Sequence, residues 1–230
     1  MLITPGDKYQ VELTAERPVI DAITSSVTSG ILYIGVDPAK SDESIKITVT
    51  LPNSALKSVQ SSAAASIFIA PGTPACAGFS AKELFISSNS AVDLYADSIT
   101  VDNLTVAGTG ASTIEVQGSI GSAIITATGS ANVSLAKVKG PVQVNGVGAS
   151  DIFVEADPAF GERMIITGTG LGASHVRHAG GECDLSKLSS AIKCEQVAAR
   201  TFAIKPVVWT RDIDINYAST CEGRSRGTYL

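Results

Sequence analysis

The chain is poor in charged and in aromatic residues. Only 17% of its 230 residues are charged and 5% are aromatic, whereas a typical soluble domain has about 25% charged residues. Hydrophobic residues nevertheless make up 44% of the chain, so the apolar content consists mainly of Ala, Val, Ile and Leu. A core of small and branched side chains favours sheet over helix.

Two kinds of partner are excluded by charge and hydropathy. The net charge of −5, from 17 basic and 22 acidic residues, argues against a nucleic-acid partner. No apolar run approaches the roughly 18 residues that span a bilayer, so we expect no membrane-spanning segment.

Met1–Gly6 lacks the features of a secretory signal. Strand-like alternation begins at Tyr9, so we expect the sequence to start inside a folded unit. The lack of a signal in these residues therefore does not indicate where the protein is located.

A nine-residue pattern recurs along the middle of the chain. Each repeat unit has an aliphatic residue at both ends and small or polar residues between them. The units begin at Val59, Ile86, Val106, Ile125, Val144 and Ile166. The spacings are 27, 20, 19, 19 and 22 residues, and the last unit, Ile166–Val176, carries two extra residues. Such regular spacing predicts a repeat architecture.

Short alternating runs between these units indicate strands with one buried face, such as Ile99–Val101 and Val142–Val144. Three short strands and three turns in about 19 residues make one coil of a β-solenoid. We therefore predict an all-β fold, a single-stranded parallel β-helix with 19–20 residues per coil. Gly-x-Gly pairs at 108–110, 146–148 and 168–170 are expected at tight corners. The alternative is a β-sandwich, which would not repeat such a corner at a fixed offset.

The two ends of the chain differ from the middle. Residues 9–57 hold longer alternating runs around a Ser29-Gly30 turn, which predicts either hairpins or wider first coils. Residues 181–230 lose the repeat, and we expect them to cap a solenoid end that would otherwise expose a strand edge. The prediction is one domain over 1–230, with N-terminal strands (1–58), β-solenoid coils (59–180) and a C-terminal cap (181–230).

Three segments together with the Gly-x-Gly repeats carry a family resemblance: Gly6–Leu13, Gly30–Ile34 and Ile47–Val59. Over roughly residues 6–178 the chain resembles the family described as "putative auto-transporter adhesin, head GIN domain". The resemblance implies a secreted or cell-surface β-helical domain and offers no catalytic residues to carry over. The chain departs from the family at Ser61–Ala65, which lacks the usual corner glycines, and in its Cys-containing insert and tail.

Carboxylates are the first candidates for chemistry, because solenoids also host polysaccharide lyases and hydrolases. The position before the closing aliphatic residue forms one outward column: Ser66, Asp93, Thr113, Asn132, Asp151 and His175. Neighbouring coils lie about 4.8 Å apart, which puts Asp93 and Asp151 about 14 Å from each other. That separation exceeds the roughly 5–9.5 Å of a glycosidase pair, so this column predicts no such pair.

Two groups of carboxylates could each converge at a corner of one coil: Asp93, Asp97 and Asp102, and Asp151, Glu155 and Asp157. We expect these six side chains to be solvated, with Ca²⁺ binding or catalysis as the alternatives. A Ca²⁺ site needs six to eight oxygen ligands. Neither group shows a loop pattern that supplies them.

Other catalytic and cofactor motifs are weak. His175 and His178 are three residues apart, which on a strand puts them on opposite faces, and no third metal ligand is evident. No Gly-x-Ser-x-Gly turn occurs, and no helix follows the Gly-x-Gly pairs to bind a dinucleotide. A threonine array at Thr126/Thr128 and Thr167/Thr169 suggests ice binding, but it is broken in four of six coils. We expect no metal, no cofactor and no enzymatic activity.

The chain has four cysteines, Cys76, Cys183, Cys194 and Cys221. Their spacing fits no zinc motif, and their position outside the repeat predicts disulfides formed in an oxidising compartment. We favour Cys183–Cys194, at short separation, over Cys76–Cys221. Free thiols are the alternative.

The sequence thus predicts a non-enzymatic, secreted or cell-surface β-solenoid with a structural or adhesive role. Expected partners are glycans or other surface proteins, and the solenoid ends could join copies of the chain into a homo-oligomer. The alternative is a carbohydrate-binding or carbohydrate-active β-helix, lyase-like or hydrolase-like. Its stacking residues would be Tyr95, Phe153 and Phe85.

Overall fold

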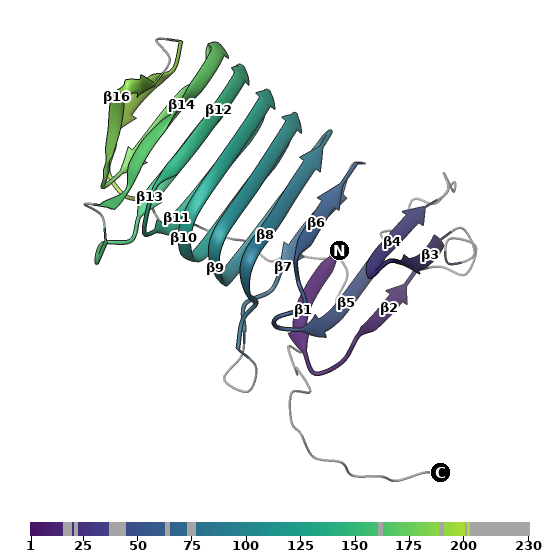
Figure 1. Ribbon diagram of the computed structural model, residues 1–230. Helices are drawn as coiled ribbons and strands as arrows, with labels where there is room; N and C mark the ends of the chain where they lie inside the picture. Colours follow the sequence, from purple (N-terminus) through teal and green to yellow (C-terminus); the bar gives the residue numbers. More distant parts are fainter. Residues whose placement is uncertain are drawn as a thin grey trace, which may run out of the picture.

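Parallel pairing between segments 19–27 residues apart builds most of the structure. The computed structural model describes residues 1–15, 20, 23–36, 45–62, 65–72, 77–160, 163–188, 191–200 and 202. These residues contain strands β1 to β17. Strands β6 to β17 form a parallel β-solenoid of about six turns, which confirms the predicted fold (Figure 1).

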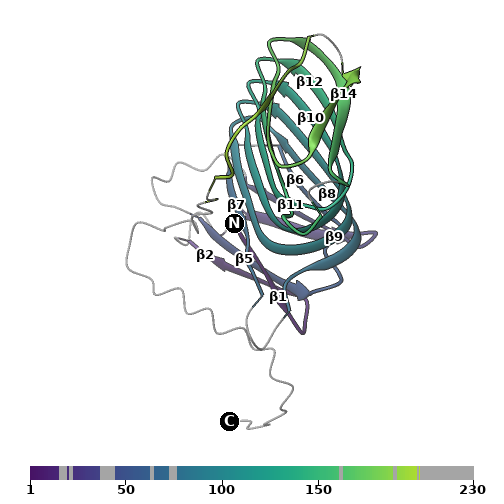
Figure 2. The same cartoon turned by 90° about the vertical axis from the view of Figure 1, so that its left-hand side faces the viewer.

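Each coil contributes one strand segment to each of two opposite faces, so that the coils appear as successive loops when viewed along the stack (Figure 2). The first face consists of β7 (Ala65–Ile69), the first part of β9 (Val92–Gly110), the first part of β10 (Thr113–Gly129), β11 (Asn132–Val138), β13 (Asp151–Ala156), β15 (His175–Ala179) and β17 (Lys193–Gln196). The second face consists of β6 (Ser58–Ser61), β8 (Ser80–Asn89), the later parts of β9 and β10, β12 (Val142–Gly148), β14 (Ile165–Gly172) and β16 (Glu182–Leu188).

The core is a stack of aliphatic columns inside the coils. Residues that close the repeat units stack from the first face: Ile67, Leu94, Ile114, Val133, Ile152 and Val176. Residues that open the units stack from the second face: Val59, Ile86, Val106, Ile125 and Val144. All of these side chains are buried. The alternation places every second residue inward, which is why short strands suffice to build a continuous core.

The Gly-x-Gly pairs form a corner at which the two faces meet. The first glycine of a pair is buried against the opposite face, and a Cβ at Gly146 would lie 2.7 Å from Ser174 Oγ. The second glycine has positive φ, +80° at Gly110 and +94° at Gly148. Because such backbone is strained for residues with a Cβ, the corner requires glycine for two different reasons.

The register corrects the predicted start of the sixth repeat unit. Val144 pairs with Gly168, whereas Ile166 pairs with Val142, so the unit begins at Gly168 and has nine residues like the others. Its corner pair is Gly170 and Gly172 instead of 168 and 170. The extra residues lie between β13 and β14. Sequence reading missed this register because a glycine occupies an aliphatic position.

The N-terminal strands extend the first face and add a hairpin. Strand β1 (Leu2–Gly6) pairs in parallel with β7 and with β5 (Lys46–Pro52), and β2 (Gln10–Thr14) pairs with β5 in antiparallel fashion. Strands β3 (Ile23–Thr28) and β4 (Ile31–Val36) form a separate antiparallel hairpin around the predicted Ser29-Gly30 turn. Of the two alternatives for this region, the hairpin is present at β3–β4.

The coil also continues beyond the end of the sequence repeat. Strand β16 pairs in parallel with β14, and β17 pairs in parallel with β15. Parallel pairing therefore extends to Gln196, although the repeat pattern is lost near residue 180. The later part of the predicted cap, residues 203–230, lies outside the described residues.

Candidate functional site

The two outward faces differ in their chemistry. The first face carries charged and aromatic side chains in two adjacent columns. The first column is Ser66, Asp93, Thr113, Asn132, Asp151, His175 and Lys193. The second column is Phe68, Tyr95, Glu115, Ser134, Phe153, Arg177 and Glu195. The first face is therefore the candidate site for recognition of a polar ligand.

The predicted outward column is present, and the register extends it to Lys193. Asp93 and Asp151 lie three coils apart in it, through Thr113 and Asn132. The second column, which runs beside it, was not predicted as a column. The sequence argument considered only the position before the closing aliphatic residue. The signal was available, since the position after that residue holds Tyr95 and Glu115 in successive units.

An ion pair and a stacked arginine order the C-terminal half of the first face. Arg177 Nε donates to Asp151 Oδ1 at 3.1 Å, and Arg177 Nη2 donates to Asp151 Oδ2. Arg200 Nη2 donates to Ser134 Oγ at 2.5 Å, and its guanidinium carbon lies 3.8 Å from the centroid of the Phe153 ring. Phe153 is buried although it points outward from its strand, because Arg200 covers it.

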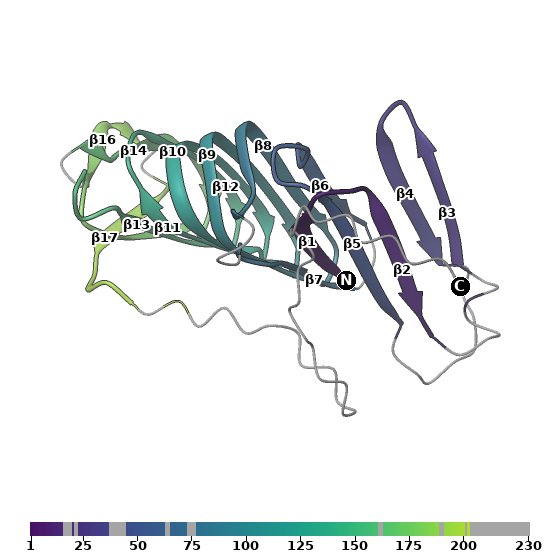
Figure 3. The same cartoon turned by 90° about the horizontal axis from the view of Figure 1, so that it is seen from below.

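The segment after β17 thus lies over the first face. It leaves the last coil where Val197 N donates to His178 O at 2.8 Å (Figure 3). Phe202 continues the contact, with its ring centroid 5.7 Å from that of Phe153. This part of the first face is occupied by the chain itself.

The electrostatics of this face are set by partial burial next to charges of both signs. Burial raises the pKa of Glu115, Arg200 opposes this shift and Asp93 adds to it. Burial likewise raises the pKa of Tyr95, with Asp93 and Glu115 contributing. Burial lowers the pKa of Arg200, as does the nearby charge of Arg177. On this face, burial disfavours the charged forms of Glu115 and Arg200, while the attraction between the two side chains favours them.

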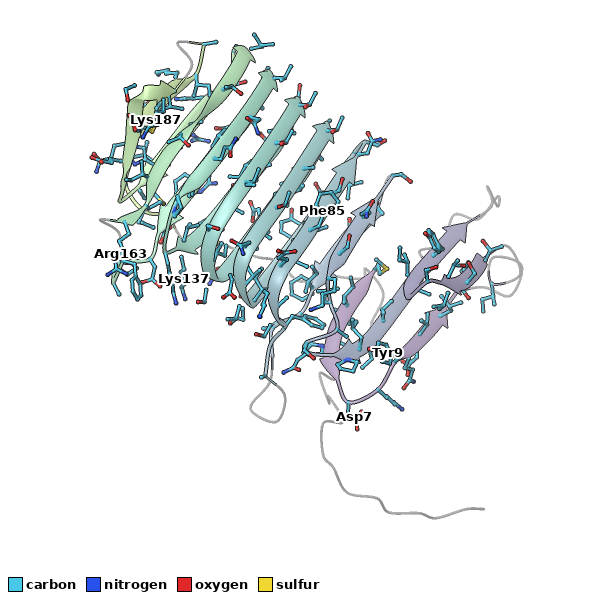
Figure 4. The ribbon with its side chains drawn as sticks, in the orientation of Figure 1. Asp7, Tyr9, Phe85, Lys137, Arg163 and Lys187 are labelled. Carbon is cyan, nitrogen blue, oxygen red and sulfur yellow. A yellow bond between two sulfur atoms is a disulfide. The ribbon has the colours of Figure 1, made fainter. Side chains whose placement is uncertain are left out.

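Two hollows lie near these residues. A small hollow of about 240 Å³ sits between the two columns and is lined by Thr113, Glu115, Asn132, Ser134, Asp151, Phe153, Arg177 and Arg200. A larger, open depression of about 1030 Å³ follows β13 and includes Glu155, Phe160, Arg163 and Glu182. Arg163 and Lys139 both lie over the ring of Phe160, and Figure 4 shows Arg163 and Lys137 at this edge of the solenoid.

The two predicted carboxylate groups do not form compact clusters. Asp97 accepts a hydrogen bond from Ser98 Oγ at 3.0 Å, and Asp157 accepts one from Ala159 N. Asp151 is paired with Arg177. Within the described ranges, the one set of three His, Cys, Asp or Glu groups close enough to share a metal ion contains none of the six predicted carboxylates.

That set consists of His178, Cys183 and Cys194. Cys183 and Cys194 form a disulfide across strands β16 and β17, with their Cα atoms 6.7 Å apart, so neither offers a thiolate ligand. His178 is buried, with Nδ1 3.0 Å from Gly180 O, whereas His175 points outward to Glu195. The opposite orientation of the two histidines is as predicted. Cys76 and Cys221 lie outside the described residues.

Fold and faces define the chain as a parallel β-solenoid that displays long ladders of side chains. The family model described as "putative auto-transporter adhesin, head GIN domain" matches residues 1–159, and the chain belongs to this family. Searches of curated proteins and of solved structures gave no match. In the part of the chain that the structure describes, no helix is long and apolar enough to cross a membrane.

Proposed function

We propose that the chain is a non-enzymatic β-solenoid of the cell surface with a structural or adhesive role, and that the first face binds glycans or other surface proteins. The observation that carries the proposal is the outward-facing group of Asp93 and Tyr95 on one coil and Thr113 on the next, in which Asp93 is exposed and the other two side chains are half-buried. Charged and aromatic side chains on a rigid face supply the orienting contacts of a recognition surface. Membership of an adhesin family supports the same role.

Rigidity is part of this function. Each coil is hydrogen-bonded to its neighbours over most of its length, so the side chains of the first face are held in fixed positions. A preorganised surface loses little conformational entropy when it binds. The solenoid therefore suits display of an adhesive face at a distance from its point of attachment.

A glycan array with the purified chain tests the adhesive role. We expect binding to one class of glycan, reduced at least about tenfold by Tyr95→Ala, which corresponds to roughly 1.4 kcal/mol. Gln60→Ala, an exposed residue of β6 on the second face, is the matched control and should leave binding unchanged. Equal loss in both variants would contradict recognition by the first face. Labelling of intact cells expressing the complete gene tests the surface location.

A carbohydrate-active enzyme is the second candidate, and one observation favours it. Asp93 and Glu115 lie in adjacent columns of adjacent coils, a diagonal of about 8 Å on strand geometry, within the roughly 6.5–9.5 Å of inverting glycosidases. Burial raises the pKa of Glu115, as a general acid requires. Release of reducing ends that Glu115→Gln abolishes and Asp97→Asn preserves would replace the adhesive proposal by this one.

The last coil argues against assembly through the C-terminal end. Strands β16 and β17 carry Lys187, Lys193 and Glu195, with the Lys193 side chain 72% exposed. Charged side chains at a sheet edge disfavour the addition of another strand. Association of copies of the chain through this end is therefore not part of the proposed function.

A further inference from the structure

From β6 to β14, three neighbouring outward columns of the second face are exposed or half-exposed and hold no charged residue. The first column is Ser58, Phe85, Thr105, Ile124, Gln143 and Thr167. The middle column is Gln60, Ser87, Ala107, Thr126, Asn145 and Thr169. The third column is Asn89, Thr109, Thr128, Val147 and Leu171. The strands lie side by side in front of the molecule, with Phe85 on β8 (Figure 4).

An uncharged surface of this size calls for an explanation. A surface designed for solubility carries about 25–35% charged residues, and this chain has 39 charged residues (17 basic and 22 acidic), yet none falls in these columns. Loss of Lys, Glu and Asp is the compositional mark of the centre of a protein–protein interface. Charged side chains of the described coils occur on the first face, as at Asp93 and Arg177, and at the margin of the second face, as at Glu83.

The same face exposes aliphatic side chains. Leu171 is 69% exposed, Ile124 44% and Val147 42%. They are embedded among hydroxyl and amide side chains, some of which are already ordered, since Thr169 Oγ1 donates to Asn145 Oδ1 at 3.0 Å. The face therefore offers exposed aliphatic side chains among polar side chains, some of which are already hydrogen-bonded to each other.

We propose that two copies of the chain pack through their second faces to form a homodimer. Three columns across six coils cover about 20 Å by 29 Å on strand geometry, so a dimer would bury on the order of 1,150 Å², above the roughly 1,000 Å² of a specific interface. The backbone hydrogen bonds of the inner strands are already satisfied within the coil, so the copies meet through side chains, as in sheet-on-sheet packing.

A second copy is the occupant that this chemistry favours. The chain carries a net charge of −5, which opposes self-association through charged surfaces, and the second face is the broad surface on which this repulsion is least. A charged partner would find no complementary charge among these columns. A glycan would find one aromatic ring, Phe85, where sugar-binding surfaces offer several for stacking.

Sedimentation velocity and light scattering of the full chain test the dimer. We expect a mass near twice the 23.6 kDa of one chain at micromolar concentration. Thr126 lies in the middle column near the centre of the face, so Thr126→Lys places a lysine of each copy close to its twin. Because a two-fold interface repeats each contact, we expect Thr126→Lys to weaken dimerisation at least about 100-fold, or roughly 2.8 kcal/mol. Asn132→Lys, at an exposed position of the first face, is the control and should leave the dimer intact.

A charge-swap mixture distinguishes loss of the interface from loss of folding. Thr126→Lys and Thr126→Glu should each be monomeric, while an equimolar mixture should restore the dimer by pairing opposite charges. A wild-type chain that stays monomeric throughout the micromolar range overturns the proposal. So does a dimer that survives both Thr126 substitutions, or one that the Asn132→Lys control disrupts instead.

Discussion

The guanidinium of Arg200 stacks on the ring of Phe153, 3.8 Å from its centroid, and donates to Ser134 of the preceding coil. One side chain thereby fastens the segment after β17 across strands β13 and β11. The face that carries the candidate recognition residues is closed at one end by this contact. Access to its C-terminal half depends on whether the arginine stays in place.

Replacing Arg200 by alanine should release this segment. A cation–π contact and a hydrogen bond of the guanidinium together contribute on the order of 1–2 kcal/mol, so opening of the segment should become at least about fivefold more frequent. Hydrogen exchange measures this directly at the Val197 amide, which donates to His178 O.

The matched variant is Arg200→Lys, which keeps the charge but loses the planar guanidinium. Its exchange rate should lie between those of the wild type and Arg200→Ala. Unchanged exchange in both variants would show that the segment is held elsewhere. Global stability should change little, because the coils beneath make their own hydrogen bonds.

Sequence periodicity predicted the solenoid because its physical cause is local. Aliphatic residues such as Ile114 and Val133 must lie one coil apart in the sequence to stack. The length of a coil can therefore be read from the spacing of these residues. The same logic predicted the outward column of Asp93 and Asp151. Chain reversal at the corners also has a local cause, the positive φ of glycines such as Gly129.

The contacts that could not be predicted join segments without periodicity. Arg200 reaches Ser134 across 66 positions of sequence, and no pattern specifies that the tail folds back. The register error at Gly168 has another origin, since a glycine in an aliphatic column carries no hydrophobic signal. The lack of charged residues in three columns of the second face is also a property of the sequence. It becomes visible only when the strand register shows which residues lie in the same column.

Gly168 should be the least replaceable glycine of the solenoid. A Cβ there would lie 1.8 Å from Val144 O, and φ is +151°. Gly110 also has positive φ, but its nearest neighbour would be at 3.4 Å. Gly110→Ala should therefore cost about 1–2 kcal/mol, from backbone strain alone.

Gly168→Ala must also move the adjacent coil, so we expect a loss above about 4 kcal/mol, in the range of exceptional substitutions. Urea unfolding of both variants, followed by circular dichroism, gives the comparison. Equal losses in the two variants would contradict the close approach of β14 to β12.

The disulfide between Cys183 and Cys194 should stabilise the last coil. It links residues 11 positions apart, and a loop of this length corresponds to about 2–3 kcal/mol of chain entropy. Reduction, or Cys183→Ser, should accelerate hydrogen exchange in β16 and β17 and leave β10 unaffected. Peptide mapping of the unreduced chain checks the pairing itself, and a free thiol at either residue would contradict it.

The pH dependence of stability should reveal the cost of holding Glu115 partly buried. Burial raises its pKa above the ordinary value, so the folded chain binds this proton more tightly than the unfolded chain. The contribution of Glu115 to the free energy of unfolding is present at pH values below its pKa in the unfolded chain. It is lost as the pH rises from there through its pKa in the folded chain.

Glu115→Gln removes this dependence while preserving shape. Relative to the wild type, the variant should gain stability at pH 7, by less than about 1 kcal/mol because solvent screens the half-exposed group, and the gain should vanish near pH 4. Urea unfolding at both pH values measures the difference. A variant that is less stable than the wild type at pH 7 would show that attraction to Arg200 outweighs desolvation, and would reverse the direction assigned to this pKa.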